Sequence, residues 1–296
     1  MQPNPALKKL GFAPDDRVVI LHADDIGMCQ STITAYSDLI DFGLMSSAAV
    51  MVPCPWFPSV AAYCRQHPEA DLGIHLTLTC EWDVYRWGPI STADPESGLL
   101  DAEGYLHRGN TPVYAHAQVS AVAREIAAQV DRAQAAGISP THMDTHMGTL
   151  AHSRFVGVYT QAAIDYRLPL MSFRWAADRI QRERGLGETD AQTLAQSIAQ
   201  MEEQGIPLLD HIVGMPLSGA KPVELAQKIL GDLQPGLTDF VFHPAQDTQE
   251  LRAIAPVWAA RVADYELFTS EEVRAFIREQ GIQVIGYRPL RDLMRQ

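Results

Sequence analysis

Short apolar runs alternate with amphipathic segments along nearly the whole chain, and this alternation limits the folds available to it. The first run, 17–23, is rich in β-branched residues, and the segment that follows, 31–42, carries apolar residues at helical spacing. Repeated strand–helix alternation is typical of parallel strands joined by crossover helices. The sequence therefore predicts an α/β fold.

The same criteria place the other elements. Strands are expected at 17–23, 46–52, 71–79, 141–145, 169–173, 211–215, 239–243 and 283–286. Helices are expected at 31–42, 56–66, 115–136, 154–166, 190–204, 222–233, 256–264 and 270–280. About eight strands in roughly 250 residues fit a distorted (β/α) TIM-like barrel, with a doubly wound open sheet as the alternative. No shift in composition marks a boundary, so we expect a single domain over residues 1–296.

The balance of charged residues excludes several classes of partner. Lysine plus arginine number 23 against 36 aspartates and glutamates, a formal net charge of −13. Nucleic acids and anionic membranes are bound through clustered basic residues, so neither is expected here. Apolar stretches such as 47–55 are too short to span a bilayer, and no signal peptide is recognisable. Four cysteines without paired spacing indicate reduced thiols and a cytoplasmic location.

Acidic residues and histidines fall at the ends of several predicted strands. Asp24 and Asp25 follow the first strand, His75 lies in the third, Arg174 follows the fifth and His243 closes the seventh. The carboxyl ends of parallel strands hold the active sites of both barrels and open sheets. Because carboxylates and imidazoles are common metal ligands, their joint placement predicts a metal site. Taken singly, His75 and His243 could instead be structural.

The predicted fourth strand carries three polar residues on one face. His142, Asp144 and His146 recur at period two. Packing alone does not account for this pattern, so one histidine is expected to bind a metal and its neighbours to support it. The spacing is not the helical HExxH of zincins, and motifs of serine hydrolases, NTPases and dinucleotide-binding proteins are missing from the sequence.

The adjacent aspartates pose a geometric problem. Neighbouring residues in a strand face opposite sides, so Asp24 and Asp25 can share a pocket only past the strand end. Gly27 supplies a flexible position for such a turn. One aspartate could then bind a cation while the other accepts a proton. Alternatively, an aspartate caps the helix that follows.

One long irregular stretch, 81–112, interrupts the alternation, and we expect it to form a loop insertion at the catalytic rim. It is rich in aromatic residues, including Trp82, Tyr85, Trp87 and Tyr105. Such side chains pack well on the faces of sugar rings, and the loop could close over the site as a lid. The equally weighted alternative is that the aromatic residues pack the loop onto the barrel.

Five segments together resemble the YdjC-like carbohydrate deacetylases, which include chitooligosaccharide and hopanoid-associated deacetylases. They are HADDIGMCQSTITA, LMSSAAVMVPCPWF, DLGIHLTLT, SPTHMDTHMGT and FVFHPA, in family order between about residues 18 and 245. The resemblance implies a distorted barrel, one divalent metal ion, zinc or magnesium, and removal of the N-acetyl group from an acetylated amino sugar or oligosaccharide.

The resemblance also implies roles for individual residues. Asp25, His75 and His146 match the metal ligands, Asp24 matches the general base, and His243 matches the general acid or oxyanion partner. His142, Asp144, Arg174, Trp82 and Trp87 are expected to bind substrate or to support these groups.

Two differences from the family pattern concern the substrate pocket. Ile26 stands where the family usually has an aromatic residue, and 147–149 replaces further histidines.

Mixed nitrogen and oxygen ligation favours zinc over magnesium. The alternative functions are a barrel amidohydrolase or phosphodiesterase acting on another small substrate, and a sugar-binding protein without catalysis. A small carbohydrate is the expected partner, and the sequence is compatible with a homodimer.

Overall fold

β1 (Arg17–Ile26) is the strand around which the sheet is built in this computed structural model, which describes residues 3–296. It pairs in parallel with β2 (Ser47–Val50) on one side and with β6 (Gly236–Phe242) on the other. The short β7 (Gln283–Val284) also pairs with β1, and the order across the sheet is β4-β3-β2-β1-β6-β5. The carboxyl ends of these parallel strands therefore lie at one end of the sheet.

The remaining elements complete this framework. The other strands are β3 (Leu72–Leu76), β4 (Met143–Thr145) and β5 (His211–Gly214). The helices are α1 (Pro5–Lys9), α2 (Gln30–Phe42), α3 (Phe57–Gln66), α4 (Asn110–His116), α5 (Val119–Ala135), α6 (Val156–Tyr166), α7 (Ala177–Arg184), α8 (Glu188–Glu203), α9 (Val223–Gly231), α10 (Gln249–Ile254), α11 (Trp258–Phe268), α12 (Glu271–Glu279) and α13 (Arg288–Met294), with short 3₁₀ turns η1 (Pro95–Ser97) and η2 (His146–Ala151).

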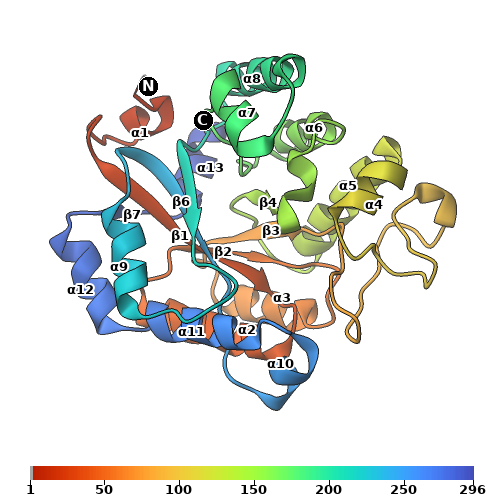
Figure 1. Cartoon of the computed structure of the whole chain (residues 1–296), viewed down its shortest axis with the longest axis horizontal. Coiled ribbons are helices and arrows are strands. Elements are labelled where there is room, and N and C mark those ends of the chain that lie inside the picture. The colour runs from red at the N-terminus through yellow and green to blue at the C-terminus, as the bar shows by residue number, and fades with distance from the viewer. Residues whose placement is uncertain (1–2) are drawn as a thin grey trace.

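The sheet curls, and helices surround it, which confirms the predicted distorted barrel (Figure 1). The segment 170–173 lies between the edge strands β4 and β5. Leu170 forms a bridge with Met143 of β4, and Phe173 forms one with Leu209, just before β5. The strand predicted at 169–173 is thus reduced to these bridges. Met171 donates to the Met143 carbonyl and the Ser172 carbonyl accepts from the Leu209 amide, so the segment makes one short contact with each neighbour.

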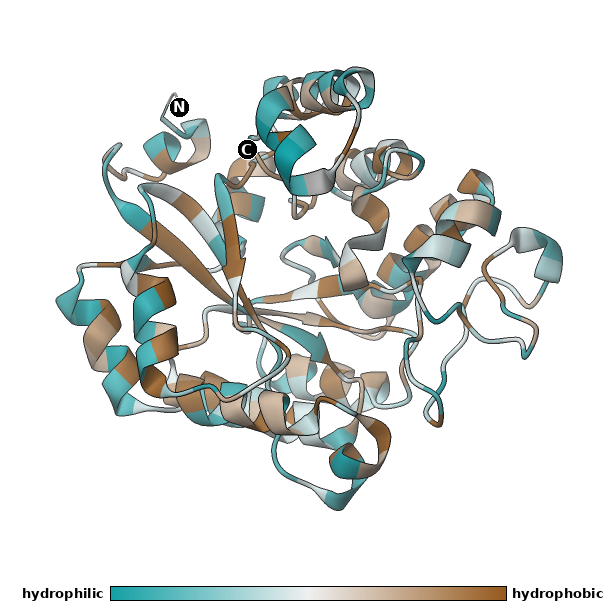
Figure 2. Ribbon diagram, viewed as in Figure 1, coloured by the Kyte–Doolittle hydropathy of each residue, from teal (hydrophilic) through white to brown (hydrophobic). Residues whose placement is uncertain are grey.

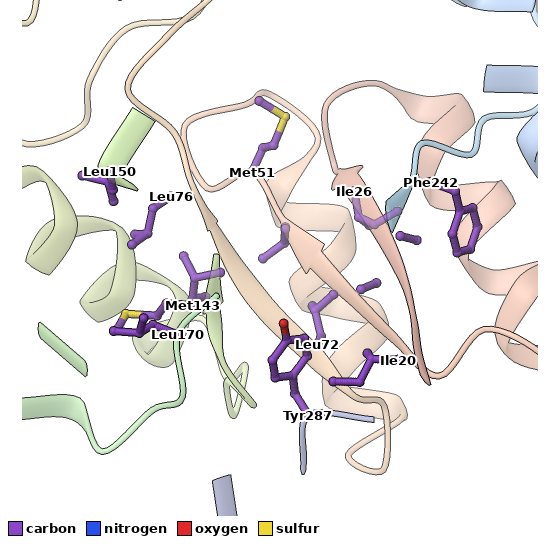
Figure 3. Packing of buried hydrophobic residues seen from close by; sticks show 14 of the residues in the cluster. Ile20, Ile26, Met51, Leu72, Leu76, Met143, Leu150, Leu170, Phe242 and Tyr287 are labelled. Atoms are coloured by element: carbon purple, nitrogen blue, oxygen red, sulfur yellow. The ribbon is translucent and has the colours of Figure 1, made fainter. Parts of the chain in front are cut away.

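Several helices have an apolar side that they bury, as α2 and α5 do with Leu39, Val122 and Ile126. Figure 2 shows apolar strands inside and polar colour on the surrounding helices, and Figure 3 shows part of the buried core along the strands. The predicted helix 115–136 corresponds to α5, except that its first two residues end the separate helix α4. The break falls at Ala117 and Gln118, whose extended backbone lets the Gln118 amide donate to the Ser97 carbonyl. Among residues 3–296, no helix combines the length and apolarity needed to cross a membrane.

One buried carboxylate inside the barrel lacks hydrogen-bond partners. Asp239 of β6 is fully buried, and neither of its side-chain oxygens has a hydrogen-bond partner among residues 3–296. Burial raises the pKa of Asp239 from 3.8 to about 7, even though the nearby His22 acts in the opposite direction. The folded protein therefore binds more protons at this position than the unfolded chain does between these two pH values.

This difference predicts how stability depends on pH. Because the folded pKa of Asp239 is raised, its ionisation lowers the free energy of unfolding as the pH rises through the window from 3.8 to about 7. Asp239→Asn removes this effect, so its stability relative to wild type should increase over that window by a few kcal/mol, on the order of 1.4 kcal/mol per pKa unit. Urea unfolding of both proteins across the window measures the difference, and a constant difference would contradict the prediction.

Candidate metal centre

β1 turns both adjacent aspartates toward one site by breaking its own alternation. The pairing of β1 with β2 shifts register between Ala23 and Ile26, and Asp25 has a left-handed backbone with φ of 63°. The irregularity lies within the strand, before the turn expected at Gly27. Cys29 is the N-cap residue of α2, so neither aspartate caps that helix.

Three side-chain atoms from three elements form a nearly equilateral triangle. Asp25 Oδ1 lies 3.2 Å from His75 Nε2 and 3.2 Å from His146 Nδ1, and the two nitrogens are 3.3 Å apart. A tetrahedral ion with bonds of about 2.0–2.1 Å places its ligand atoms about 3.3–3.4 Å apart. Asp25 Oδ1 is also buried with no hydrogen-bond partner in the part of the chain described. The residues present therefore fit a metal ion with these three ligands.

A charged side chain contacts each candidate ligand on the side that faces away from the triangle. His75 Nδ1 lies 2.8 Å from Asp144 Oδ1, and His146 Nε2 lies 3.0 Å from Glu81 Oε2. If both bonds carry the histidine proton, the opposite nitrogens are left bare and point at the triangle, as metal ligation requires. Arg261 donates to Asp25 Oδ2 at 2.7 Å, which leaves Oδ1 as the free oxygen.

The charges of the site determine its pKa shifts. Burial alone would raise the pKa of Asp25, but Arg261 and His146 outweigh it and hold this pKa well below its usual value. Burial lowers the pKa of His75, but Asp144 and Asp24 raise it well above 6.5. The pKa of His146 is raised to about 9, because Glu81 and Asp25 outweigh its burial. The carboxylate of Asp25 is thus held ionised.

Asp24 and His243 lie beside the triangle and are the more accessible groups. Asp24 Oδ1 accepts from His22 Nδ1 at 2.8 Å, while Oδ2 lies 3.7 Å from His243 Nε2 and 3.9 Å from His75 Nε2. The side chains of Asp24 and His243 are 14% and 17% exposed, against 1–2% for Asp25 and His75. Burial lowers the pKa of His243 although Asp25 and Asp24 oppose this, so its ring is neutral at physiological pH.

The backbone of His243 is anchored by a buried ion pair. Its amide donates to Asp264 Oδ2 at 2.9 Å, and Asp264 Oδ1 accepts from Lys221 Nζ at 2.6 Å. Both charged side chains are fully buried. The carboxyl end of β6 is thereby fixed to α11 and to the loop that precedes α9.

The two tryptophans of the 81–112 insertion pack inward, whereas Tyr105 is exposed. Trp82 and Trp87 are 5% and 3% exposed, and their rings contact each other edge to face at 5.9 Å. Trp87 Nε1 donates to the Thr79 carbonyl, and its ring centre lies 6.5 Å from that of His146. Little of either ring is available to a sugar in this conformation, so a direct role in substrate binding stays a prediction.

The structure brings most of the expected residues together, but not all. Asp144 and His142 lie beneath the triangle, where Asp144 contacts His75 and His142 contacts His22. Arg174 lies elsewhere. It pairs with Glu202 and with Asp210, whose amide bonds to Leu237 at the start of β6, the opposite end of that strand from His243. Its position after a predicted strand was misleading because that segment is only bridged to the sheet.

Two of the residues that contact the candidate ligands were not expected from the sequence. Glu81 is the first residue of the insertion, and its place soon after the third strand was a usable signal. Arg261 lies on α11, far from every recognised segment, and no local pattern distinguishes it from a surface arginine.

Comparisons with known proteins place this site in context. The family described as YdjC-like protein matches residues 18–279. A "Carbohydrate deacetylase" of Thermus thermophilus is 33% identical over 92% of this chain and 94% of its own. One from Thermoanaerobacter pseudethanolicus is 25% identical over 92% and 98%. A solved structure from Enterococcus faecalis, named for cellobiose-phosphate cleavage, has a TM-score of 0.77 at 23% identity and covers 93% of this chain and 99% of its own. At that identity it supports the fold alone.

The metal centre predicts the effect of removing one ligand. The purified protein should bind about one divalent metal ion per chain, and His146→Ala should lower this occupancy strongly because two protein ligands remain. His67→Ala, which changes a part-exposed histidine at the end of α3, is the matched control. Metal content after dialysis against zinc and then against buffer measures the effect. Full occupancy in His146→Ala would refute the ligand assignment.

The packing of the insertion predicts a loss of stability. Trp87→Ala leaves a cavity beside His146 and should lower the free energy of unfolding by about 3–5 kcal/mol. Val84→Ala, at a position that is 77% exposed in the same loop, should leave stability near wild type. Chemical unfolding tests both, together with KM once a substrate is known. A stable Trp87→Ala protein with a raised KM would instead indicate contact with the sugar.

Proposed function

Because the chain belongs to the YdjC-like family, we propose that it is a carbohydrate deacetylase, a metal-dependent hydrolase. The reaction is hydrolysis of the N-acetyl group of an acetylated amino sugar or oligosaccharide, which yields acetate and a free amine. The observation that carries the proposal is the triangle of Asp25, His75 and His146, with Asp24 at its accessible side. The names of the Thermus and Thermoanaerobacter relatives support the substrate class.

The metal would be held by Asp25 Oδ1, His75 Nε2 and His146 Nδ1. A divalent ion bound there would polarise the amide carbonyl and lower the pKa of a water molecule. We propose zinc, because two imidazole nitrogens and one carboxylate oxygen at this spacing suit it. Magnesium prefers ligands that are all oxygen and is the alternative.

Asp24 is the proposed general base. His22 holds one of its oxygens, Oδ1, so that Oδ2 faces the accessible side of the site. Burial would raise the pKa of Asp24, but His75 and His22 lower it below its usual value, so the carboxylate is ionised and can accept a proton. In this role Oδ2 takes the proton from the attacking water.

His243 is the proposed partner of the leaving group. Its Nε2 lies 3.7 Å from Asp24 Oδ2, and its ring is neutral. A neutral imidazole beside the base can receive the proton that Asp24 has taken and pass it to the departing amine. The Lys221–Asp264 pair keeps the backbone of His243 in place during this transfer. The same ring could donate to the oxyanion once it is protonated.

We also propose a cytoplasmic location. Cys29, Cys54, Cys64 and Cys80 are all buried free thiols. Unpaired thiols are typical of reducing compartments. This supports an enzyme that meets small acetylated sugars inside the cell.

The division of labour between the aspartates is directly testable. Asp24→Asn should keep the metal but lose turnover by roughly two orders of magnitude or more, because the amide cannot accept the proton. Asp25→Asn should lose metal and turnover together. Asp41→Asn, on the exposed end of α2, serves as the control. Acetate release and metal content are measured on the same samples. Loss of metal in Asp24→Asn with retention in Asp25→Asn would reverse the two roles.

A further inference from the structure

A string of hydrogen-bonded side chains runs through the inside of the barrel from Asp24 to the other end of the strands. Asp24 Oδ1 bonds to His22 Nδ1 at 2.8 Å, and His22 Nε2 lies 2.8 Å from His142 Nε2. His142 Nδ1 lies 3.1 Å from Thr141 Oγ1, which in turn bonds to Asp71 Oδ1 at 2.7 Å. None of these residues is a proposed metal ligand.

The surroundings of the string are shaped to hold the two imidazole rings. His22 and His142 are fully buried. A Cβ atom at Gly73 would lie 2.4 Å from the His142 ring, so only glycine leaves room for that ring in β3. On another side, the ring of Tyr287 stacks on His142 with centres 3.8 Å apart. The His22–His142 contact is therefore a fitted arrangement with little freedom to reorient.

The far end of the string fixes the direction of its hydrogen bonds. Asp71 accepts from the Ser47 hydroxyl at 2.8 Å and from the Arg288 amide at 2.7 Å, as well as from Thr141. An ionised carboxylate only accepts, so the single hydroxyl proton of Thr141 goes to Asp71. Thr141 Oγ1 must then accept from His142 Nδ1, which makes His142 a donor at Nδ1.

The same reasoning determines the protons on His22. The ring contact holds one proton between the two Nε2 atoms. Burial and the charge of His22 hold the pKa of His142 well below 6.5, so His142 is neutral with a bare Nε2, and the proton comes from His22 Nε2. His22 Nδ1 also donates, to the carboxylate of Asp24. His22 therefore carries protons on both nitrogens. The proton shared with Asp24 belongs on the imidazole, which is ordinarily the more basic group.

We propose that His22 is a permanently protonated positioning residue, which the Asp71–Thr141–His142 string holds as an imidazolium and which fixes Asp24 for its role as base. The proposal rests on the proposed function, because Asp24 is the base only there. In this arrangement His22 donates to Asp24 Oδ1 and fixes the carboxylate, so that Oδ2 faces His243. The fixed positive charge behind Asp24 also favours its ionised form.

The charges around His22 agree with this assignment. Asp24 faces it from β1, Asp144 from β4 with Oδ2 at 3.8 Å, and Asp239 from β6. Burial lowers the pKa of His22, but these three carboxylates outweigh it and raise the pKa to about 9. Burial and the neighbouring His22 hold the pKa of His142 well below 6.5. One ring is thus charged and the other neutral, and this assignment satisfies every hydrogen bond of the string.

The first test reads the protons directly. Two-bond ¹H–¹⁵N correlation spectra of the zinc-loaded full chain, labelled with ¹⁵N-histidine, report the protonation of each ring nitrogen among its 10 histidines. Near neutral pH, His22 should be protonated at both nitrogens and His142 at Nδ1 alone. A neutral His22, or a His142 protonated at Nε2, would overturn the proposal. Because this readout needs no substrate, it stands or falls separately from the deacetylase assignment.

The second test breaks the string at a distance from the metal. Thr141→Val removes the hydroxyl while keeping the shape, and should lower kcat about 10- to 100-fold with KM and zinc content unchanged. The same variant should lose the imidazolium signal of His22. Thr141→Ser, which restores the hydroxyl, should recover both, and Thr193→Val on the exposed face of α8 is the matched control. Wild-type kcat and an unchanged His22 signal in Thr141→Val would overturn the proposal.

A third variant covers the case in which Thr141→Val does not fold. Gly73→Ala places a methyl group against the His142 ring and should disrupt the ring contact without removing any polar group. Gly157→Ala adds a methyl group with no neighbour within 4 Å and is its control. Loss of the His22 imidazolium in Gly73→Ala alone supports the proposal, and its persistence with His142 displaced contradicts it.

Discussion

Asp24 and Asp25 can serve one site only because β1 gives up the regular alternation of a strand near its end. A left-handed backbone at a residue other than glycine costs about 1–2 kcal/mol, and Asp25 adopts one with φ of 63°. Two contacts hold it there. Arg261 binds Oδ2 of Asp25, and the Met51 amide bonds to the Ile26 carbonyl where pairing with β2 resumes. The separation of ligand from base depends on this local distortion.

Around that distortion, charged side chains orient all three candidate ligands. Asp144, Glu81 and Arg261 each orient one ligand from the side away from the triangle. The rings and the carboxylate stand at the spacing that a small tetrahedral cation requires. The anchoring groups come from β4, from the insertion and from α11. Segments far apart in the sequence therefore jointly orient the three candidate ligands.

The sequence predicted those features of the site that follow from strand periodicity. His75, His142, Asp144 and His146 were found because charged and imidazole side chains are uncommon in buried strands unless they serve a site, and the structure brings them together. Arg261 could not be predicted, because a helix on the outside of a barrel gives no local sign of which residue reaches inward. Arg174 was predicted at the end of the strands that holds the site, but it pairs with Asp210 at the opposite end. Its segment is only bridged to the sheet, so its place in the sequence did not indicate which end of the barrel it would reach.

The irregular segment 81–112 shows a related limit. Its composition was informative, but burial depends on which side chains the rest of the chain covers, and Trp82 and Trp87 prove to be covered. A long insertion can therefore support a site by closing off one of its walls, and Glu81 and Trp87 both lie against His146.

The family match ends at residue 279, yet the ring that stacks on His142 belongs to Tyr287, and the amide that completes the bonding of Asp71 belongs to Arg288. Shortening the chain at that boundary would look harmless on an alignment. It would also remove the Tyr287 ring that stacks on His142 and the Arg288 amide that donates to Asp71. The string that leads to Asp24 would then lose contacts at its far end. Expression designs, fusions and affinity tags should therefore treat the C-terminal segment as part of the catalytic unit.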